Sequence, residues 1–277
     1  MGKLPNINVD AWLAIFADKN HCIQLDVTDP YQHYGMEVPC RALSSPVLCF
    51  VILALMLRHL GFVSSLDEIE TLQYHSKSLQ LLIPALSSPN NSNDDVLAAT
   101  VILQLFEEMN GQNHSTSAKQ HLKLTWLELD DDYQCHLSGI TSMLTLKPPS
   151  NIQSRLHEST AWLYLHQDIY ISLVTQGSPR TNLEEFIRFY DATEDNDFGW
   201  AKKIVLLITR ALFVMNYDLL SSEKMNRWHE LNKLVEQWHS NKPSSFLPIY
   251  QSPDKSSENR LPEIWALSPV HGMWLHI

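Results

Sequence analysis

The chain has 277 residues, of which 44% are hydrophobic and 18% charged, so its composition is that of a folded protein with a sizeable core and not of a disordered segment. Its formal net charge of −11 opposes binding to a nucleic-acid backbone, which requires a basic surface. Only 8 glycines are present, which argues against glycine-rich phosphate-binding loops and tight β-hairpins.

The four cysteines, Cys22, Cys40, Cys49 and Cys135, form no C-x-x-C pair. Their small number and irregular spacing predict free thiols in a reducing compartment and no disulfide framework. The first ten residues lack the apolar run of a secretory signal, so an intracellular chain is expected.

A short amphipathic helix is predicted over 9–16, followed by an irregular, partly extended connection over 20–34. The most apolar run of the chain then predicts a helix over 46–60, because Pro46 suits a first helical turn. Every residue of 47–57 is apolar, so this helix is expected to be buried on all sides. It is too short to span a bilayer, and no membrane association is expected.

Two more helices are predicted before residue 111. The first begins at Ser65 or Asp67 and runs to about Leu86. Its expected buried face is Ile69, Leu72, Leu79, Leu82 and Ile83, with Tyr74, His75 and Lys77 facing outward. The second begins at Asp94 or Asp95 and ends near 110–111, and its expected buried side is Val96, Ala99, Leu103 and Phe106.

The stretch 111–130 is polar and breaks this helical pattern. A helix is then predicted over 154–176, ended by Pro179, with a buried face of Leu156, Ala161, Trp162, Leu165, Ile169 and Leu173. The acidic stretch 186–197 is expected to be a loop.

Two long helices are predicted in the last third of the chain. The first, over 199–217, is mostly apolar and is expected to be buried. The second runs over 222–240, with a seam against neighbouring helices formed by Trp228, Leu231, Val235 and Trp238. A Pro- and Ser-rich connection follows, and Pro269 is expected to begin a final helix.

The 13 histidines do not form pairs with the spacing of zinc ligands, and no metal site or cofactor is expected. No sequence motif of a hydrolase, metalloprotease, nucleotide-binding or dinucleotide-binding protein occurs. The two motifs by which terpene cyclases hold magnesium and pyrophosphate also fail, at Asp130–Asp132 and at Asn196–Asp197, because the remaining ligands are missing. The sequence therefore predicts no catalytic residues.

Four polar residues in the predicted helices are candidates for a network: Arg58, His59, His166 and Asp168. A buried charge must be paired, so an ion or hydrogen-bond network between helices is the expected role. The alternative is that these residues line a small-molecule or partner pocket between helices.

A resemblance to a known family rests on the stretch DPYQHYGMEVPCRALSSPVLCFVILALMLRHL at 29–60. This stretch resembles the opening of the regulatory domain of fungal-specific zinc-cluster transcription factors. The matching positions are Asp29, Pro30, His33, Val38, Pro39, Arg41, Ala42, Pro46, Val47, Leu48, Ala54, Leu55, Arg58, His59 and Leu60. Similar blocks recur downstream, as in NDDVLAATVILQLFEEMN and ESTAWLYLHQDIYISLVTQ.

The resemblance implies an all-α fold, a bundle or irregular array of antiparallel helices, as one regulatory domain over 1–277 with an off-pattern insertion at about 111–130. The six-cysteine module that holds two zinc ions and reads DNA in this family does not occur in the chain. The family's helical region normally continues further, so a truncated carboxyl end is expected, and the chain is interpreted as a fragment.

The expected function is therefore regulation of RNA polymerase II transcription in the nucleus. The expected partners are protein coregulators or an unknown small-molecule effector, without direct DNA binding by this chain. Two alternatives remain open, a freestanding helical scaffold without a transcriptional role and an all-α metal-dependent enzyme.

Overall fold

The computed structural model describes residues 9–17, 25–61, 68–86, 93–111, 154–190, 192–216, 221–252 and 263–272. The described residues are helical apart from turns, loops and one short pair of strands, which confirms the predicted all-α fold class. The chain divides into two compact units. Unit 1 is Met1–Asp26 with Tyr31–Gln167, and unit 2 is Val27–Pro30 with Asp168–Ile277. A single domain over 1–277 stays a prediction, and the insertion predicted at 111–130 lies almost wholly outside the described residues.

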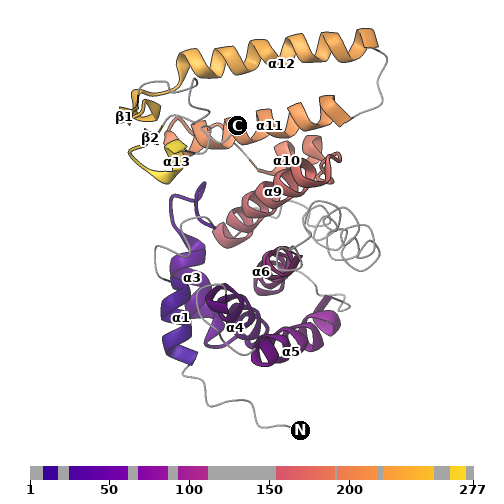
Figure 1. Ribbon diagram of the computed structural model, residues 1–277, viewed down its shortest axis with the longest axis vertical. Helices are drawn as coiled ribbons and strands as arrows, with labels where there is room; N and C mark the ends of the chain where they lie inside the picture. Colours follow the sequence, from indigo (N-terminus) through magenta and orange to yellow (C-terminus); the bar gives the residue numbers. More distant parts are fainter. Residues whose placement is uncertain are drawn as a thin grey trace. The chain divides into compact units, whose positions relative to one another are not determined.

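Helix α4 (Pro46–Gly61) is the centre of unit 1, as predicted. Its residues 51–58 are all buried. It contacts four other helices, which surround it in Figure 1: α1 (Val9–Ala17), α3 (His33–Ala42), α5 (Glu68–Leu86) and α6 (Asp94–Gly111). No described helix is long and apolar enough to cross a lipid bilayer.

Helix α3 was not predicted, and the irregular connection predicted over 20–34 is wrong at His33 and Tyr34, with which this helix begins. Pro39 lies inside the helix, although proline usually interrupts one. The helix forms because Asp26 stabilises its beginning. The carboxylate of Asp26 accepts hydrogen bonds from the backbone N–H groups of Tyr34 (2.9 Å) and Gly35 (2.8 Å), which have no partner within the first turn. The buried Tyr34 also donates its hydroxyl to Thr160 Oγ1 at 3.1 Å.

Helix α5 is present, but its predicted buried face is only partly correct. Leu82 is buried as predicted, at 1% exposure. Ile69, Leu72 and Ile83 are instead 61%, 51% and 57% exposed, and Tyr74, which was predicted to face outward, is 3% exposed. Ring stacking explains the rotation of the helix. Tyr74 stacks on Phe50 of α4 with ring centroids 6.0 Å apart, and His75 stacks on Phe106 of α6 at 4.6 Å. Ser78, one turn further along, is buried, and its hydroxyl donates to the carbonyl oxygen of His75 at 2.7 Å.

Helices α6 and α9 (Arg155–Thr175) confirm the predicted helices. Helix α6 is buried on more sides than predicted, with 96–104 all buried. Asp94 at its first turn accepts a short hydrogen bond from the Ser154 hydroxyl and pairs with His157 Nδ1 at 3.2 Å. The predicted burial of Leu173 is wrong, since it is 57% exposed near the end of α9.

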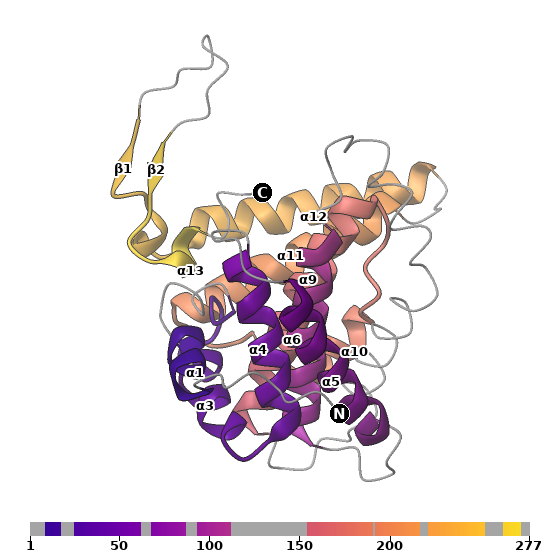
Figure 2. The same ribbon diagram turned by 60° about the horizontal axis from the view of Figure 1, so that its bottom comes forward.

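Unit 2 contains α11 (Asp197–Asn216) and α12 (Ser221–Asn241), which run side by side (Figures 1 and 2). Both helices were predicted. Of the expected seam on α12 only Leu231 and Trp238 are buried, while Trp228 and Val235 are 40% and 37% exposed. The indole N–H of Trp238 donates to the carbonyl oxygen of Trp200 at 2.9 Å, which satisfies a polar group in the core.

The stretch predicted as a loop contains helix α10 (Leu183–Phe189), so this prediction is wrong over Phe186–Phe189. Asn182 caps the helix, because its side chain accepts a hydrogen bond from the backbone N–H of Glu185 at 3.3 Å. Phe186 is buried and anchors the helix.

The carboxyl-terminal part of unit 2 consists of short elements. These are a 3-10 turn η2 (Ser244–Phe246), strands β1 (Tyr250–Gln251) and β2 (Ile264–Trp265), and helix α13 (Pro269–Gly272), which begins at the predicted proline. The strands pair antiparallel with Tyr250 opposite Trp265, and Figure 2 shows them projecting from the helices of unit 2.

Candidate functional site

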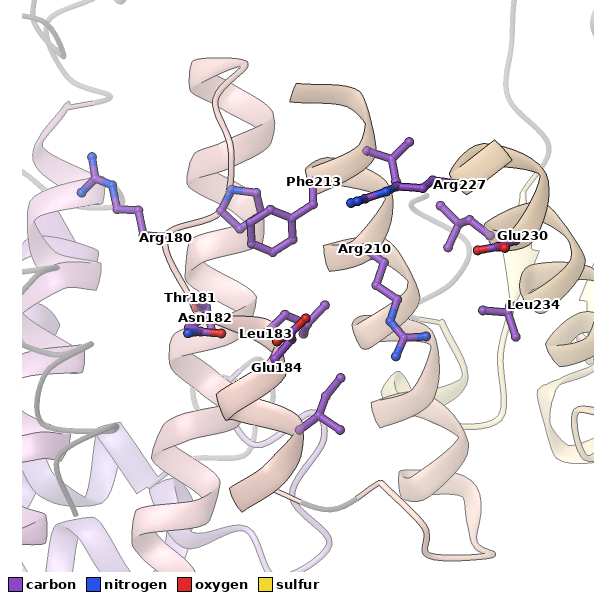
Figure 3. Close-up of a pocket in the computed structure, with 14 residues that line it drawn as sticks. Arg180, Thr181, Asn182, Leu183, Glu184, Arg210, Phe213, Arg227, Glu230 and Leu234 are labelled. Carbon is purple, nitrogen blue, oxygen red and sulfur yellow. The ribbon is translucent and has the colours of Figure 1, made fainter. Parts of the chain in front are cut away.

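A pocket of about 690 Å³ lies within unit 2, among α10, α11, α12 and the segment before α10 (Figure 3). This volume is in the range of sites that hold small organic ligands. Its lining is Pro179, Arg180, Thr181, Asn182, Leu183, Glu184, Ile187, Arg210, Phe213, Val214, Arg227, Glu230, Leu231 and Leu234.

Asp168 fixes one wall of the pocket. Its carboxylate is 1% exposed and accepts hydrogen bonds from the backbone N–H of Arg180 at 2.9 Å and from the backbone N–H and hydroxyl of Thr181 at 2.8 and 2.7 Å. Hydrogen bonds to an ionised acceptor are stronger than neutral ones. The wall is therefore held in place without a ligand.

Half of the fourteen lining residues of the pocket are apolar. Leu231 is buried in the core of unit 2, and Phe213 extends from α11 toward the segment before α10. Leu234 of α12 and Ile187 of α10 also line the pocket and are 39% and 37% exposed. An apolar group of a ligand would bury this surface on binding.

Charged groups of both signs line the same pocket. They are the guanidinium groups of Arg180, Arg210 and Arg227 and the carboxylates of Glu184 and Glu230. Arg227 pairs with Glu223 of its own helix at 2.8 Å. Arg210 has no ion pair with any carboxylate of the described residues. Figure 3 shows Arg210 in the space between α10 and α12 and Arg180 turned away from the other labelled side chains.

The four residues predicted to form a network are distributed as follows. Arg58 is buried and His59 exposed near the end of α4. His166 and Asp168 are two residues apart on α9 and so face different directions. Burial lowers the pKa of His166 to about 4, and neither ring nitrogen has a hydrogen-bond partner among the described residues. The network stays a prediction, while Asp168 is shown to hold the wall of the pocket.

Asp197, the first residue of α11, connects this helix to two other elements of unit 2. It accepts a hydrogen bond from the Ser245 hydroxyl at 2.7 Å and pairs with His271 Nε2 at 2.7 Å, which joins α11 to η2 and α13. Burial by itself would raise the pKa of Asp197, but these two partners outweigh it and hold the pKa below its ordinary value. Asp130–Asp132 lie outside the described residues. Among the residues that the structure describes, no group of three or more His, Cys, Asp or Glu is arranged to hold a metal ion.

Sequence reasoning did not find the pocket. Its lining comes from segments far apart in the chain, and residues such as Arg210 and Glu230 have the spacing of ordinary exposed helix positions. The nearest signal was Asp168 on α9, one of four polar residues for which a pocket was one of the two interpretations.

Comparison with known proteins gives one family. The model of the fungal specific transcription factor domain matches residues 29–212, about two thirds of the chain. No curated protein and no solved structure matches the chain significantly.

Proposed function

Because the chain belongs to the family of fungal specific transcription factor domains, it has a transcription-regulatory role, and we propose that it is the regulatory helical region of a zinc-cluster transcription factor. This family is not typically enzymatic. We place its action in the nucleus, on transcription by RNA polymerase II, through contacts with an effector or a coregulator.

The observation that supports action by contact is the pocket of unit 2. It has the size and the mixed apolar and polar lining of a ligand site, and its wall is held by Asp168 before any ligand binds. A ligand that binds one conformation of a helical domain better than another shifts the population toward it. In this proposal the ligand regulates transcription by such a population shift, because the transcription machinery contacts one conformation of the domain better than the other.

The test is a reporter assay in a fungal cell. The full chain is fused to a heterologous DNA-binding module, and transcription from its cognate promoter is compared between variants. Leu234→Trp fills the pocket from α12, where the side chain is 39% exposed. Val235→Trp is the matched control, because Val235 is its neighbour, is 37% exposed and does not line the pocket.

We expect Leu234→Trp to change reporter output severalfold and Val235→Trp to leave it as in the parent fusion, at equal protein levels. Equal output from both variants would contradict a regulatory pocket. A fusion with no effect on transcription at all would favour the freestanding scaffold.

A further inference from the structure

We propose that the pocket of unit 2 takes a small zwitterion of the amino-acid class, with one carboxylate, one ammonium group and an apolar body. This inference rests on the proposed regulatory function and names the chemistry of its ligand. Three features of the pocket support it: an arginine without a carboxylate partner among the described residues, two carboxylates in the same lining, and apolar side chains that make up half of the lining.

Arg210 is the group for the ligand's carboxylate. Among the arginines of the lining, Arg227 is engaged by Glu223 at 2.8 Å and Arg180 is turned away from the other labelled side chains in Figure 3. Arg210 extends into the space between α10 and α12 and has no ion pair with the carboxylates that the structure describes. A guanidinium group presents paired N–H donors that match a carboxylate.

Glu184 and Glu230 are the groups for the ligand's ammonium. They come from α10 and α12, and both are exposed toward solvent. Because each lines the same pocket as Arg210, a purely anionic ligand would bring its charge close to two carboxylates, and like charges repel. A polyanion such as a nucleoside triphosphate is disfavoured even more, since Arg227 is paired with Glu223 and Arg180 is turned away, which leaves the guanidinium group of Arg210 against two carboxylates. A ligand with one charge of each sign satisfies both sets of groups.

Phe213, Leu231 and Leu234 receive the apolar body. Leu231 is 5% exposed, and Phe213 provides an aromatic ring in the same lining. An indole or phenyl ring would bury its surface there and stack against Phe213.

Three probes that share an indole body separate the contributions of the two charges. Tryptophan carries both charged groups, tryptamine lacks the carboxylate, and indole-3-propionate lacks the ammonium group. Each is titrated into the full chain by isothermal titration calorimetry. We expect tryptophan to bind at least about tenfold more tightly than either of the other two, because each missing group removes a charge-assisted hydrogen bond.

Variants assign each charge to its residue. Arg210→Gln should remove the preference for tryptophan over tryptamine and leave tryptamine binding within about twofold. The double change Glu184→Gln with Glu230→Gln should remove the preference for tryptophan over indole-3-propionate. Arg188→Gln, which removes an exposed guanidinium of α10 that does not line the pocket, should leave all three titrations unchanged.

Equal binding of all three probes, or no saturable binding by any of them, overturns the zwitterion. Tighter binding of indole-3-propionate than of tryptophan overturns it in favour of a simple organic anion. If the probes fail while Leu234→Trp still alters reporter output, the ligand class is wrong and the proposed function stands. If the probes discriminate as expected while Leu234→Trp leaves output unchanged, the site is right and the proposed function is wrong.

Discussion

Two polar residues on one helix illustrate how position decides the role of a buried group. The carboxylate of Asp168 accepts three hydrogen bonds from the segment 180–181. His166, two residues earlier, has no such partner among the described residues, and burial lowers its pKa to about 4. The first holds the wall of a pocket, and the second is a neutral core imidazole at physiological pH.

Replacing Asp168 by Asn is expected to lower the free energy of unfolding by about 2 kcal/mol, because a charged acceptor is removed and the amide N–H₂ faces donors. Thr181→Val removes only the hydroxyl donor and is expected to cost about 1 kcal/mol. Urea unfolding followed by circular dichroism measures both. Equal stability of Asp168→Asn and the parent chain would show that the wall does not depend on this carboxylate.

Glu108 on α6 gives the chain a pH-dependent stability. Burial raises its pKa from the ordinary 4.5 to about 7, a hydrogen bond from Gln104 opposes the shift, and the charge of Glu107 adds to it. The folded chain therefore holds a proton that the unfolded chain has released, so this contribution to stability falls as the pH rises from about 4.5 to 7.

Glu108→Gln should remove that contribution and raise the free energy of unfolding by roughly 2–3 kcal/mol at pH 8. The difference between variant and parent should disappear near pH 4.5. The free energies of unfolding of variant and parent must be compared at each pH, because His166 contributes the opposite pH dependence. Its contribution to the stability of the chain decreases as the pH falls toward 4. Glu236→Gln, on the exposed face of α12, is the control and should give no such difference at any pH.

At the scale of elements, the sequence predicted the helices that are apolar nearly all round. Helix α4 was predicted with its burial because eleven consecutive apolar residues, 47–57, allow no wet face. Helices α3 and α10 were missed because hydrogen bonds at their first turns stabilise them. In α3 the bonds to Asp26 outweigh the internal proline, and in α10 the cap at Asn182 outweighs the acidic composition. The predicted face of α5 was wrong at Ile69, Leu72 and Ile83, because aromatic stacking on α4 and α6 determines the rotation of this helix more than the spacing of its aliphatic residues does.

The corrected orientation of α5 can be tested with two leucines of the same helix. Leu82→Ala is expected to lower the free energy of unfolding by about 3 kcal/mol, because a fully buried side chain is removed and a cavity remains. Leu72→Ala should cost less than about 1 kcal/mol, since half of its side chain is already exposed. Chemical denaturation measures the free energy of unfolding of both variants. Equal decreases would show that Leu72 is as buried as Leu82, as the aliphatic spacing predicts.

At the scale of the whole molecule, the candidate site could not be predicted, because no local pattern joins its parts. The lining runs from Pro179 to Leu234 over three helices and is charged and apolar in nearly equal measure, like ordinary surface. The family could be predicted, since the matching stretches are long and local, and the match to 29–212 covers them. Fold class and family are thus properties of local sequence, while the site is a property of tertiary arrangement.

The net charge of −11 leads to the last prediction, that the chain by itself does not bind DNA. Affinity for duplex DNA comes largely from counterions released when basic residues neutralise phosphates, and an acidic chain gains little from this. Titrating the chain into a fluorescently labelled duplex should give no saturable change in anisotropy up to about 10 μM, where basic proteins already show non-specific binding.

The same titration at about 50 and 200 mM salt distinguishes weak local binding from none, because any affinity that depends on basic side chains at phosphates falls steeply as the salt concentration rises. The fusion to a heterologous DNA-binding module is the positive control and should bind its own site with unchanged affinity. Tight, sequence-specific binding by the unfused chain would contradict the prediction, and it would mean that a basic surface forms locally despite the overall charge.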